Sequence, residues 1–336
     1  TVYKKRAKSG SMKTVFVTGA NGLLGTNLVH EILALGWQVK ALVRNPDSFK
    51  GGEHSHLELI KGYLQEDLSL HMETCEVVIH IAAETRQHLL RYSDYQKINC
   101  NATISLFRSA LVSGSVKKFV FVSSANTIGH SDLFELGSED KAVRYPFKDS
   151  YYAKSKLEAE NFLLQNKDSM DVIIVNPTFM LGAYDTKPSS GKIILMGWKK
   201  HILFYPPGGK NFVDVKDVAR GIIAGIEKGK NGEKYLLANN NLSYKAFFEL
   251  LRQYSNQRPI MIPLPKWLLY LLGYGGNCAR FFGLETSISL TNMRILCQNN
   301  FFSNKKSVQN LGIKYRPIDA AIHDAVTYFK SENVLR

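Results

Sequence analysis

Thr18-Gly-Ala-Asn-Gly-Leu-Leu-Gly25 separates two segments of different hydrophobic pattern. Before it, Lys13-Thr-Val-Phe-Val-Thr is an apolar, β-branched run of the length of a buried parallel strand. After it, residues 26–35 repeat apolar side chains at helical spacing, and the pattern stops at Gly36. The sequence therefore predicts a strand, a glycine turn and a helix.

The three glycines of this turn indicate a bound ligand. Gly19, Gly22 and Gly25 lack a β-carbon, so the backbone can bend sharply and approach a pyrophosphate at the unpaired N–H groups of the following helix. Their Gly-x-x-Gly-x-x-Gly spacing matches the dinucleotide fingerprint in part. A tight turn without a ligand is the alternative, and the flanking strand and helix favour the dinucleotide.

A basic residue after the second expected strand indicates which dinucleotide binds. That strand, Gln38 to Val43, is followed by Arg44. An acidic residue near this point binds the ribose 2′-hydroxyl of NAD, whereas Arg accommodates the 2′-phosphate of NADP. Arg44 therefore favours NADP as the cofactor, with NAD as the alternative.

Polar side chains further along the chain form a candidate catalytic group. Lys118-Phe-Val-Phe-Val-Ser123 reads as a buried strand, so Ser123 and Ser124 lie at its carboxyl end, where ligands bind in open α/β sheets. Tyr152 and Lys156 are four residues apart in a stretch of good helix formers, so their side chains share one face.

This group is suited to proton transfer. An ammonium beside the phenol is expected to lower the pKa of Tyr152 from about 10 toward neutrality, where a general acid or base works best. We expect Tyr152 to protonate a carbonyl oxygen held by Ser124 while NADPH delivers hydride, and Lys156 to bind the nicotinamide ribose. A surface Tyr–Lys pair on an amphipathic helix is the alternative, and the position after the serine-bearing strand favours catalysis.

The motifs together resemble the extended branch of the short-chain dehydrogenase/reductase family, from about Met12 to the C-terminus. Within that branch, the chain is most similar to dihydroflavonol-4-reductase-like and 3β-hydroxysteroid-dehydrogenase-like proteins, and epimerases and dehydratases are close kin. Besides the motifs above, the resemblance rests on His80-Ile-Ala-Ala83, Asn99 in Lys97-Ile-Asn-Cys-Asn-Ala-Thr, Asn176-Pro-Thr, Phe212-Val-Asp-Val-Lys-Asp-Val-Ala219, Ala41-Leu-Val-Arg-Asn-Pro46 and Ile262-Pro-Leu-Pro-Lys-Trp.

The resemblance implies roles for particular residues. Ser124, Tyr152 and Lys156 are the implied catalytic positions, and Asn99 is implied to support them by shaping the helix that contacts Lys156. The family's Gly-Asp-Leu after the third strand is Gly62-Tyr-Leu64 here, so adenine recognition must differ locally. The implied cofactor contacts are Gly19, Asn21, Gly22, Leu23, Leu24, Gly25, Arg44, Leu64, Ala82, Ala83, Tyr152, Lys156 and Pro177.

Alternating strand and helix patterns through Asn176 predict an α/β fold, a Rossmann-like doubly wound parallel sheet with a smaller C-terminal substrate lobe. We expect residues 12–176 and about 212–240 to form the dinucleotide-binding domain. The return to that domain would use a strand from Phe212 to Val215, a helix to about Lys228 and a strand from Glu233 to Ala238. Residues of about 177–211 and 241–336 would form the substrate lobe.

The composition of the chain limits the kinds of partner that it is expected to bind. The net charge of +14 raises nucleic acid as a partner, but no nucleic-acid-binding motif accompanies it, and spread surface charge explains it better. The segment from Lys266 to Tyr274, followed by Arg280-Phe-Phe, mixes aromatics, leucines and cations, and it is too short to span a bilayer. We expect it to line a substrate pocket or to pack in the small lobe, and peripheral membrane contact is the less favoured alternative.

The cysteines, the first eleven residues and the resemblance indicate where the protein is located and how it assembles. Four widely spaced cysteines suggest no disulfide framework and no metal site, which fits a reducing cytoplasm. Residues 1–11 are basic and without an apolar stretch, so we expect a disordered extension or an expression remnant, with Met12 the natural start. The resemblance implies a homodimer through the helices of Asn99 and Tyr152.

The sequence favours an NADPH-dependent reductase of a ketone or aldehyde on a fairly apolar small molecule. The first rival is a nucleotide-sugar epimerase or dehydratase that retains NAD(P), against which Arg44 counts. A second rival is a non-catalytic sensor or scaffold that binds NADP, against which Tyr152 and Lys156 count. Fold kinship does not identify the substrate.

Overall fold

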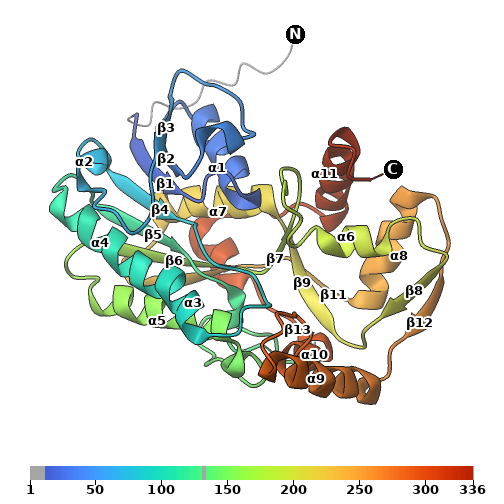
Figure 1. Cartoon of the computed structure of the whole chain (residues 1–336). Helices are drawn as coiled ribbons and strands as arrows, with labels where there is room; N and C mark the ends of the chain where they lie inside the picture. The colour runs from blue at the N-terminus through green and yellow to red at the C-terminus, as the bar shows by residue number, and fades with distance from the viewer. Residues whose placement is uncertain (1–11, 131–133, 336) are drawn as a thin grey trace, which may run out of the picture.

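Seven parallel strands form the central sheet of the computed structural model, which describes residues 12–130 and 134–335 (Figure 1). The strand order is β10-β6-β5-β4-β1-β2-β3, and every pairing is parallel. The fold class predicted from the sequence is confirmed, while the expected extension at residues 1–11 lies outside the described residues. The strands are β1 (Thr14–Thr18), β2 (Gln38–Val43), β3 (Leu57–Lys61), β4 (Val77–His80), β5 (Lys118–Val122), β6 (Asp171–Pro177) and β10 (Glu233–Leu237).

Side chains on the central strands point alternately to two apolar cores. In β5, Val120 and Val122 belong to one core, and Phe119 and Phe121 belong to the other. The first core is covered by α1 (Leu23–Ala34) and α7 (Val215–Lys228), the second by α4 (Ala102–Val112) and α5 (Tyr151–Gln165). Because both faces are covered by apolar helices, the strands are continuous apolar runs in the sequence.

A second lobe is built on a smaller sheet around β9 (Gly209–Asp214). The expected strand from Phe212 lies in this sheet and not among the seven central strands, so the chain returns to the central sheet through α7 and β10. Phe212 stacks on Phe247 of α8 (Tyr244–Ser255) with ring centroids 4.5 Å apart, and burial in this lobe explains the placement. β9 pairs with β7 (Phe179–Leu181), β11 (Asn240–Ser243) and β13 (Asn299–Asn300), and β8 (Ile202–Tyr205) pairs with β12 (Ile260–Pro263).

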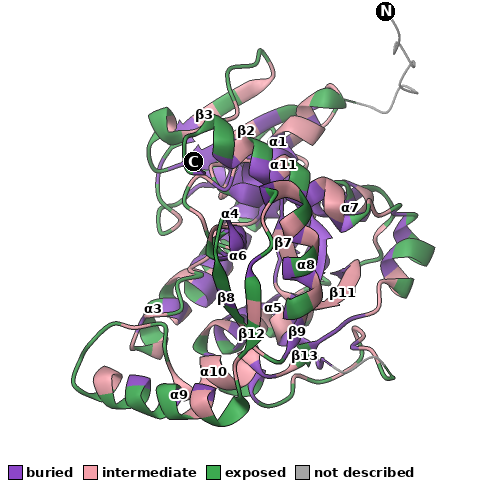
Figure 2. Cartoon of the chain, turned by 90° about the vertical axis from the view of Figure 1, so that its right-hand side faces the viewer, coloured by how far each residue is buried: buried purple, intermediate pink, exposed green. Residues whose placement is uncertain are grey.

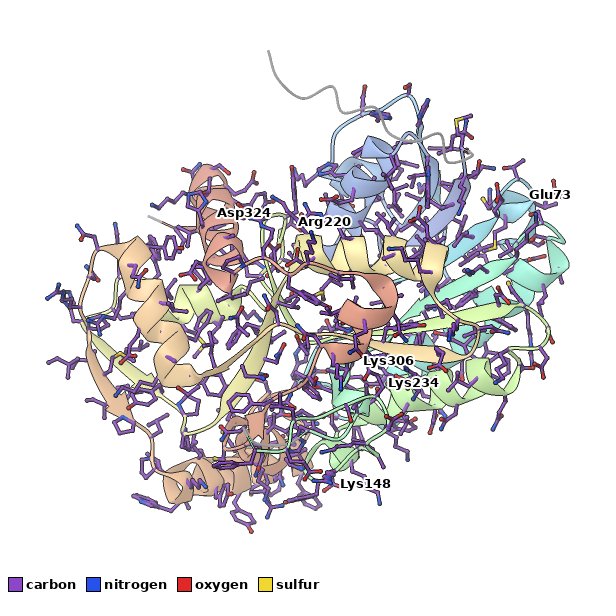
Figure 3. The ribbon with its side chains drawn as sticks, turned by 180° about the vertical axis from the view of Figure 1, so that it is seen from behind. Glu73, Lys148, Arg220, Lys234, Lys306 and Asp324 are labelled. Carbon is purple, nitrogen blue, oxygen red and sulfur yellow. The ribbon has the colours of Figure 1, made fainter. Side chains whose placement is uncertain are left out.

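Charged pairs link α7 to helices on both sides. Arg220 pairs with Glu31 of α1 at 3.3 Å, and Lys216 pairs with Asp324 of α11 (Ile318–Ser331) at 2.7 Å; Figure 3 labels Arg220 and Asp324. α7 therefore connects the central sheet with the second lobe. Further helices are α2 (Ser69–Met72), α3 (Tyr92–Gln96), α6 (Lys192–Gly197), α9 (Lys266–Phe281) and α10 (Leu290–Leu296), with a π-helical turn at Lys97–Asn101 between α3 and α4.

Candidate active site

The glycine turn joins β1 to α1 as the sequence predicts, and its glycines have different structural reasons. Gly19 has a φ of +72°, and a β-carbon there would lie 2.7 Å from the backbone nitrogen of Ala82 after β4. A β-carbon on Gly25 would lie 2.1 Å from the carbonyl oxygen of Gly19. The chain's own packing therefore requires glycine at positions 19 and 25.

Gly22 is different, because the protein itself does not demand a glycine there. Its φ is −97°, and the nearest atom to an added β-carbon is the carbonyl oxygen of Gly19 at 3.5 Å, an ordinary contact. Gly22 is the N-cap of α1 and has no side-chain cap, so the first-turn N–H groups are available to a ligand. This space and these donors fit the pyrophosphate of a dinucleotide.

A buried polar chain joins the ends of β1 and β4 to α4. The Thr18 Oγ1 lies 2.7 Å from His80 Nδ1 and accepts from the N–H of Ala82 at 3.3 Å, and His80 Nε2 lies 2.9 Å from Thr103 Oγ1. Thr103 donates to the carbonyl of Asn99 at 2.8 Å, so the network assigns the proton of His80 to Nε2. Burial, aided by the charge of Lys156, lowers the pKa of His80 to about 3, and the ring stays neutral.

Asn99 lies in the π-helical turn and joins two parts of the site. Its side chain exchanges hydrogen bonds with the backbone of Glu84, accepting from the N–H at 2.7 Å and donating to the carbonyl at 3.0 Å. It also donates to Ser155 Oγ at 3.0 Å, and Ser155 precedes Lys156 on α5. Asn99 therefore holds the segment after β4 against the helix that carries Tyr152 and Lys156.

Ser124 and Tyr152 are brought into contact by two local structures. Ser124 follows β5 and caps a short 3₁₀ turn, while Tyr152 lies in the first turn of α5, which is capped by Ser150. Burial raises the pKa of Tyr152, and the hydroxyl of Ser124, which is placed to donate to the phenol oxygen, opposes the rise. The expected lowering of that pKa is wrong, because burial of the phenol outweighs the effects that favour its ionisation.

Lys156 lies one turn further along α5, and only 1 % of its surface is exposed. Its ammonium donates to the carbonyl oxygen of Val122 on β5 at 2.7 Å and lies 4.0 Å from the ring centroid of Phe121. Burial lowers the pKa of Lys156 to about 7, and the carboxylate of Glu160 opposes this shift. The lysine is thus held against the strand that leads to Ser124, with its charge only partly present at neutral pH.

A buried carboxylate behind Lys156 was not anticipated from the sequence. Glu160 is fully buried, and its Oε1 accepts from Ser123 at 2.5 Å, Thr127 at 2.7 Å and Asn176 at 2.8 Å. Its other oxygen pairs with the ammonium of Lys234 on β10. The signal in the sequence was its spacing, because residues 152, 156 and 160 share one helix face.

The remaining expected cofactor residues lie at the same edge of the sheet. Arg44 is exposed after β2, and the amide of Asn21 donates to Ser48 at 3.0 Å, which joins the glycine turn to that loop. Leu64 packs on the second core beyond β3, and Pro177 ends β6. Most of the expected site residues therefore follow or end one of strands β1 to β6, at the edge where α/β folds bind ligands. Helical segments carry the others: Asn99, Tyr152 and Lys156 reach the edge in this way, while Leu23, Leu24 and Gly25 lie in the first turn of α1, the two leucines within the first core.

Comparison with known proteins agrees with this arrangement. The model of the NAD dependent epimerase/dehydratase family matches residues 15–238, more than half of the chain. The chain belongs to this family. Membership makes it an NAD(P)-dependent oxidoreductase, and the family resemblance expected from the motifs is confirmed.

Individual relatives of the family support the same conclusion. The chain is 28 % identical over 336 residues to a protein of Synechocystis named "Putative dihydroflavonol 4-reductase", covering 96 % of each chain. It is 30 % identical over 249 residues to the sterol-4-alpha-carboxylate 3-dehydrogenase, decarboxylating, of Dictyostelium discoideum, covering 70 % of this chain and 75 % of the relative. A solved structure titled "Crystal structure of gox2253" is 27 % identical with a TM-score of 0.83, covering 96 % of this chain and all of that one.

Proposed function

We propose that the protein is an NADPH-dependent reductase of a ketone or aldehyde on an apolar small molecule. The observation that carries the proposal is the placement of Ser124 and Tyr152 together beside the buried Lys156, at the sheet edge that also holds the glycine turn. The relatives named as a reductase and as a 3-dehydrogenase support carbonyl–alcohol chemistry. Arg44, exposed after β2, supports NADP over NAD.

The site residues have defined tasks in this reaction. A bound reduced nicotinamide supplies the hydride. Tyr152 donates its phenolic proton to the carbonyl oxygen, which Ser124 holds by a hydrogen bond, so the product is an alcohol. The raised pKa of Tyr152 keeps the phenol protonated at neutral pH, as a general acid for reduction requires.

The chain's own residues prepare the cofactor side of the site. Gly22 and the first turn of α1 would hold the pyrophosphate, Arg44 the 2′-phosphate, and Lys156 the nicotinamide ribose. Asn99 keeps the segment of Glu84 against α5, so that the two sides of the site stay together. We place this chemistry in the cytoplasm, whose reducing conditions suit the exposed free thiol of Cys278.

Cofactor titration is the first test. Purified protein is titrated with NADPH and NADH by fluorescence, and the same measurement is made on Arg44→Asp. We expect tighter binding of NADPH, and loss or reversal of this preference in the variant because a carboxylate repels the 2′-phosphate. Equal affinity for both cofactors in the wild type and in the variant would remove the argument from Arg44.

A carbonyl panel with NADPH then tests the reaction itself. Tyr152→Phe should lower turnover by a factor on the order of 10² or more, because the proton donor is lost. Tyr151→Phe is the matched control: it changes the neighbouring phenol on the same helix, which is exposed, and should retain activity. Full activity in Tyr152→Phe would overturn the assignment.

A nucleotide-sugar epimerase or dehydratase is the second candidate, because the family's own description covers both activities. In those reactions the hydride is returned, so the cofactor stays bound through the cycle. NAD(P) that remains with the protein through purification and does not exchange would favour this candidate and direct the search to nucleotide sugars.

A further inference from the structure

Helix α9 presents an apolar stripe to solvent. Trp267, Leu271, Tyr274 and Phe281 recur at helical spacing, and Trp267 is 67 % and Phe281 86 % exposed. Phe282, directly after the helix, is 75 % exposed. Figure 2 shows α9 at the foot of the molecule with much of its surface exposed. A helix facing water normally carries polar residues on that face.

The orientation of the stripe is fixed by packing on the opposite side. Leu269, Gly273 and Gly276 are the buried residues of α9. A β-carbon on Gly276 would lie 2.1 Å from the carbonyl oxygen of Ile288, and one on Gly273 would lie 2.8 Å from the Cα of Leu290 on α10. The glycines allow this close approach, so only the inner face of the segment packs in the lobe, and the aromatic face points outward.

The charge around the stripe favours one kind of partner. Helix α9 contains no Asp or Glu, whereas Lys266 and Arg280 lie on it, and the guanidinium of Arg294 on α10 lies 5.9 Å from the ring centroid of Tyr270. A symmetric contact with a second copy would place the same cationic surface on both sides and repel itself. An anionic surface with an apolar interior matches both the charge and the stripe.

We infer that α9 is an interfacial helix that binds anionic lipid bilayers, with its aromatic stripe at the boundary between headgroups and acyl chains. At 16 residues the helix is about 24 Å long, shorter than the hydrocarbon core of a bilayer. Among the described residues, no helix is long and apolar enough to span a membrane. The helix would therefore lie in the plane of the interface.

The position of α9 connects this surface with the active site. The guanidinium of Arg280 donates to the carbonyl of Leu89 at 2.7 Å and to that of His88 at 3.3 Å. His88 and Leu89 belong to the segment that follows β4, and Asn99 holds the backbone of Glu84 in this segment beside α5. An apolar substrate dissolved in the bilayer would thus arrive next to the reaction site. This route rests on the proposed function, whereas the lipid contact does not.

Tryptophan fluorescence tests the contact directly. The chain has three Trp, of which Trp37 and Trp198 are buried, so a change on addition of vesicles reports Trp267. We expect a blue shift and co-sedimentation with vesicles of phosphatidylcholine and phosphatidylserine. Binding should be weaker to phosphatidylcholine alone and should fall with added salt.

Matched variants distinguish vesicle binding through the apolar stripe from binding through the overall positive charge. Phe281→Ser/Phe282→Ser should weaken vesicle binding by about tenfold or more, because two apolar side chains no longer enter the interface. Leu70→Ser, on α2 and 75 % exposed, should leave binding unchanged. Turnover of a water-soluble carbonyl substrate should be the same in both variants.

Three results would overturn the inference. The first is no binding to anionic vesicles. The second is binding that the double phenylalanine variant leaves unchanged, which would assign it to net charge alone. The third is a concentration-dependent dimer that the variant dissociates without any vesicle binding, which would assign the stripe to a second copy. Because vesicle binding needs no turnover, a failed reductase assay would not produce any of these results.

Discussion

The pair of Glu160 and Lys234 gives the sharpest test of what holds the active site together. Lys234→Met removes the cation from a carboxylate that is fully buried behind Lys156, while keeping most of the side-chain volume. Figure 3 labels Lys234 and, nearby, Lys306, whose partner is Glu233 on the same strand.

The expected loss of stability in Lys234→Met depends on how deeply the ion pair is buried. Removing one partner of a fully buried ion pair costs about 3–5 kcal/mol, because an uncompensated charge remains. Lys234 is 21 % exposed, so water can reach part of the vacated space, while the hydrogen bonds from Ser123, Thr127 and Asn176 and the attraction to Lys156 remain. We therefore expect the lower end of the range, a loss of about 3 kcal/mol in the free energy of unfolding.

Urea unfolding of three variants measures this loss. Lys306→Met is the control, because Lys306 and Glu233 form a pair in which both side chains are partly exposed, and it should cost less than about 1 kcal/mol. Lys234→Met/Glu160→Gln should recover about 2 kcal/mol relative to Lys234→Met, since a neutral amide removes the buried charge but still accepts hydrogen bonds. Equal losses at Lys234 and Lys306, or no recovery in the double variant, would refute the reasoning.

Further predictions concern the glycine turn and the buried histidine. Gly25→Ala should destabilise the fold by about 1–3 kcal/mol, because its β-carbon would overlap the Gly19 carbonyl; thermal unfolding checks this. Gly22→Ala should unfold like the wild type yet bind NADPH at least about tenfold more weakly, as titration would show. His80 is neutral in the fold down to about pH 3, whereas it protonates near 6.5 when unfolded, so it removes stability as pH falls through this window. Between pH 6 and 4, the free energy of unfolding of a His80→Gln variant should fall by about 1.4 kcal/mol less per pH unit than that of the wild type. Parallel plots of the free energy of unfolding against pH for the two proteins would contradict this.

The local hydrophobic pattern of the sequence is enough to predict most strands of the central sheet and the edge of the sheet at which ligands bind. The run before Gly19 and the one before Ser123 are apolar throughout because helices cover both faces of a parallel sheet, and this reading does not depend on which strands pair. The strand of Phe212 shows the limit of such reading. Its pattern fits a strand in either lobe, and only its pairing with β7 and β11, together with the stacking of Phe212 on Phe247, places it in the smaller sheet.

The sequence by itself determined the strand–turn–helix unit, the carboxyl-edge position of Ser124, and the shared face of Tyr152 and Lys156, because each follows from short-range spacing. Only the tertiary structure decided the pKa values of that group and the buried partners of Glu160. Lys234 is 74 residues away from Glu160, and no local pattern encodes such a contact. Burial depends on how distant segments pack, and burial is what raises the pKa of Tyr152 and lowers that of Lys156.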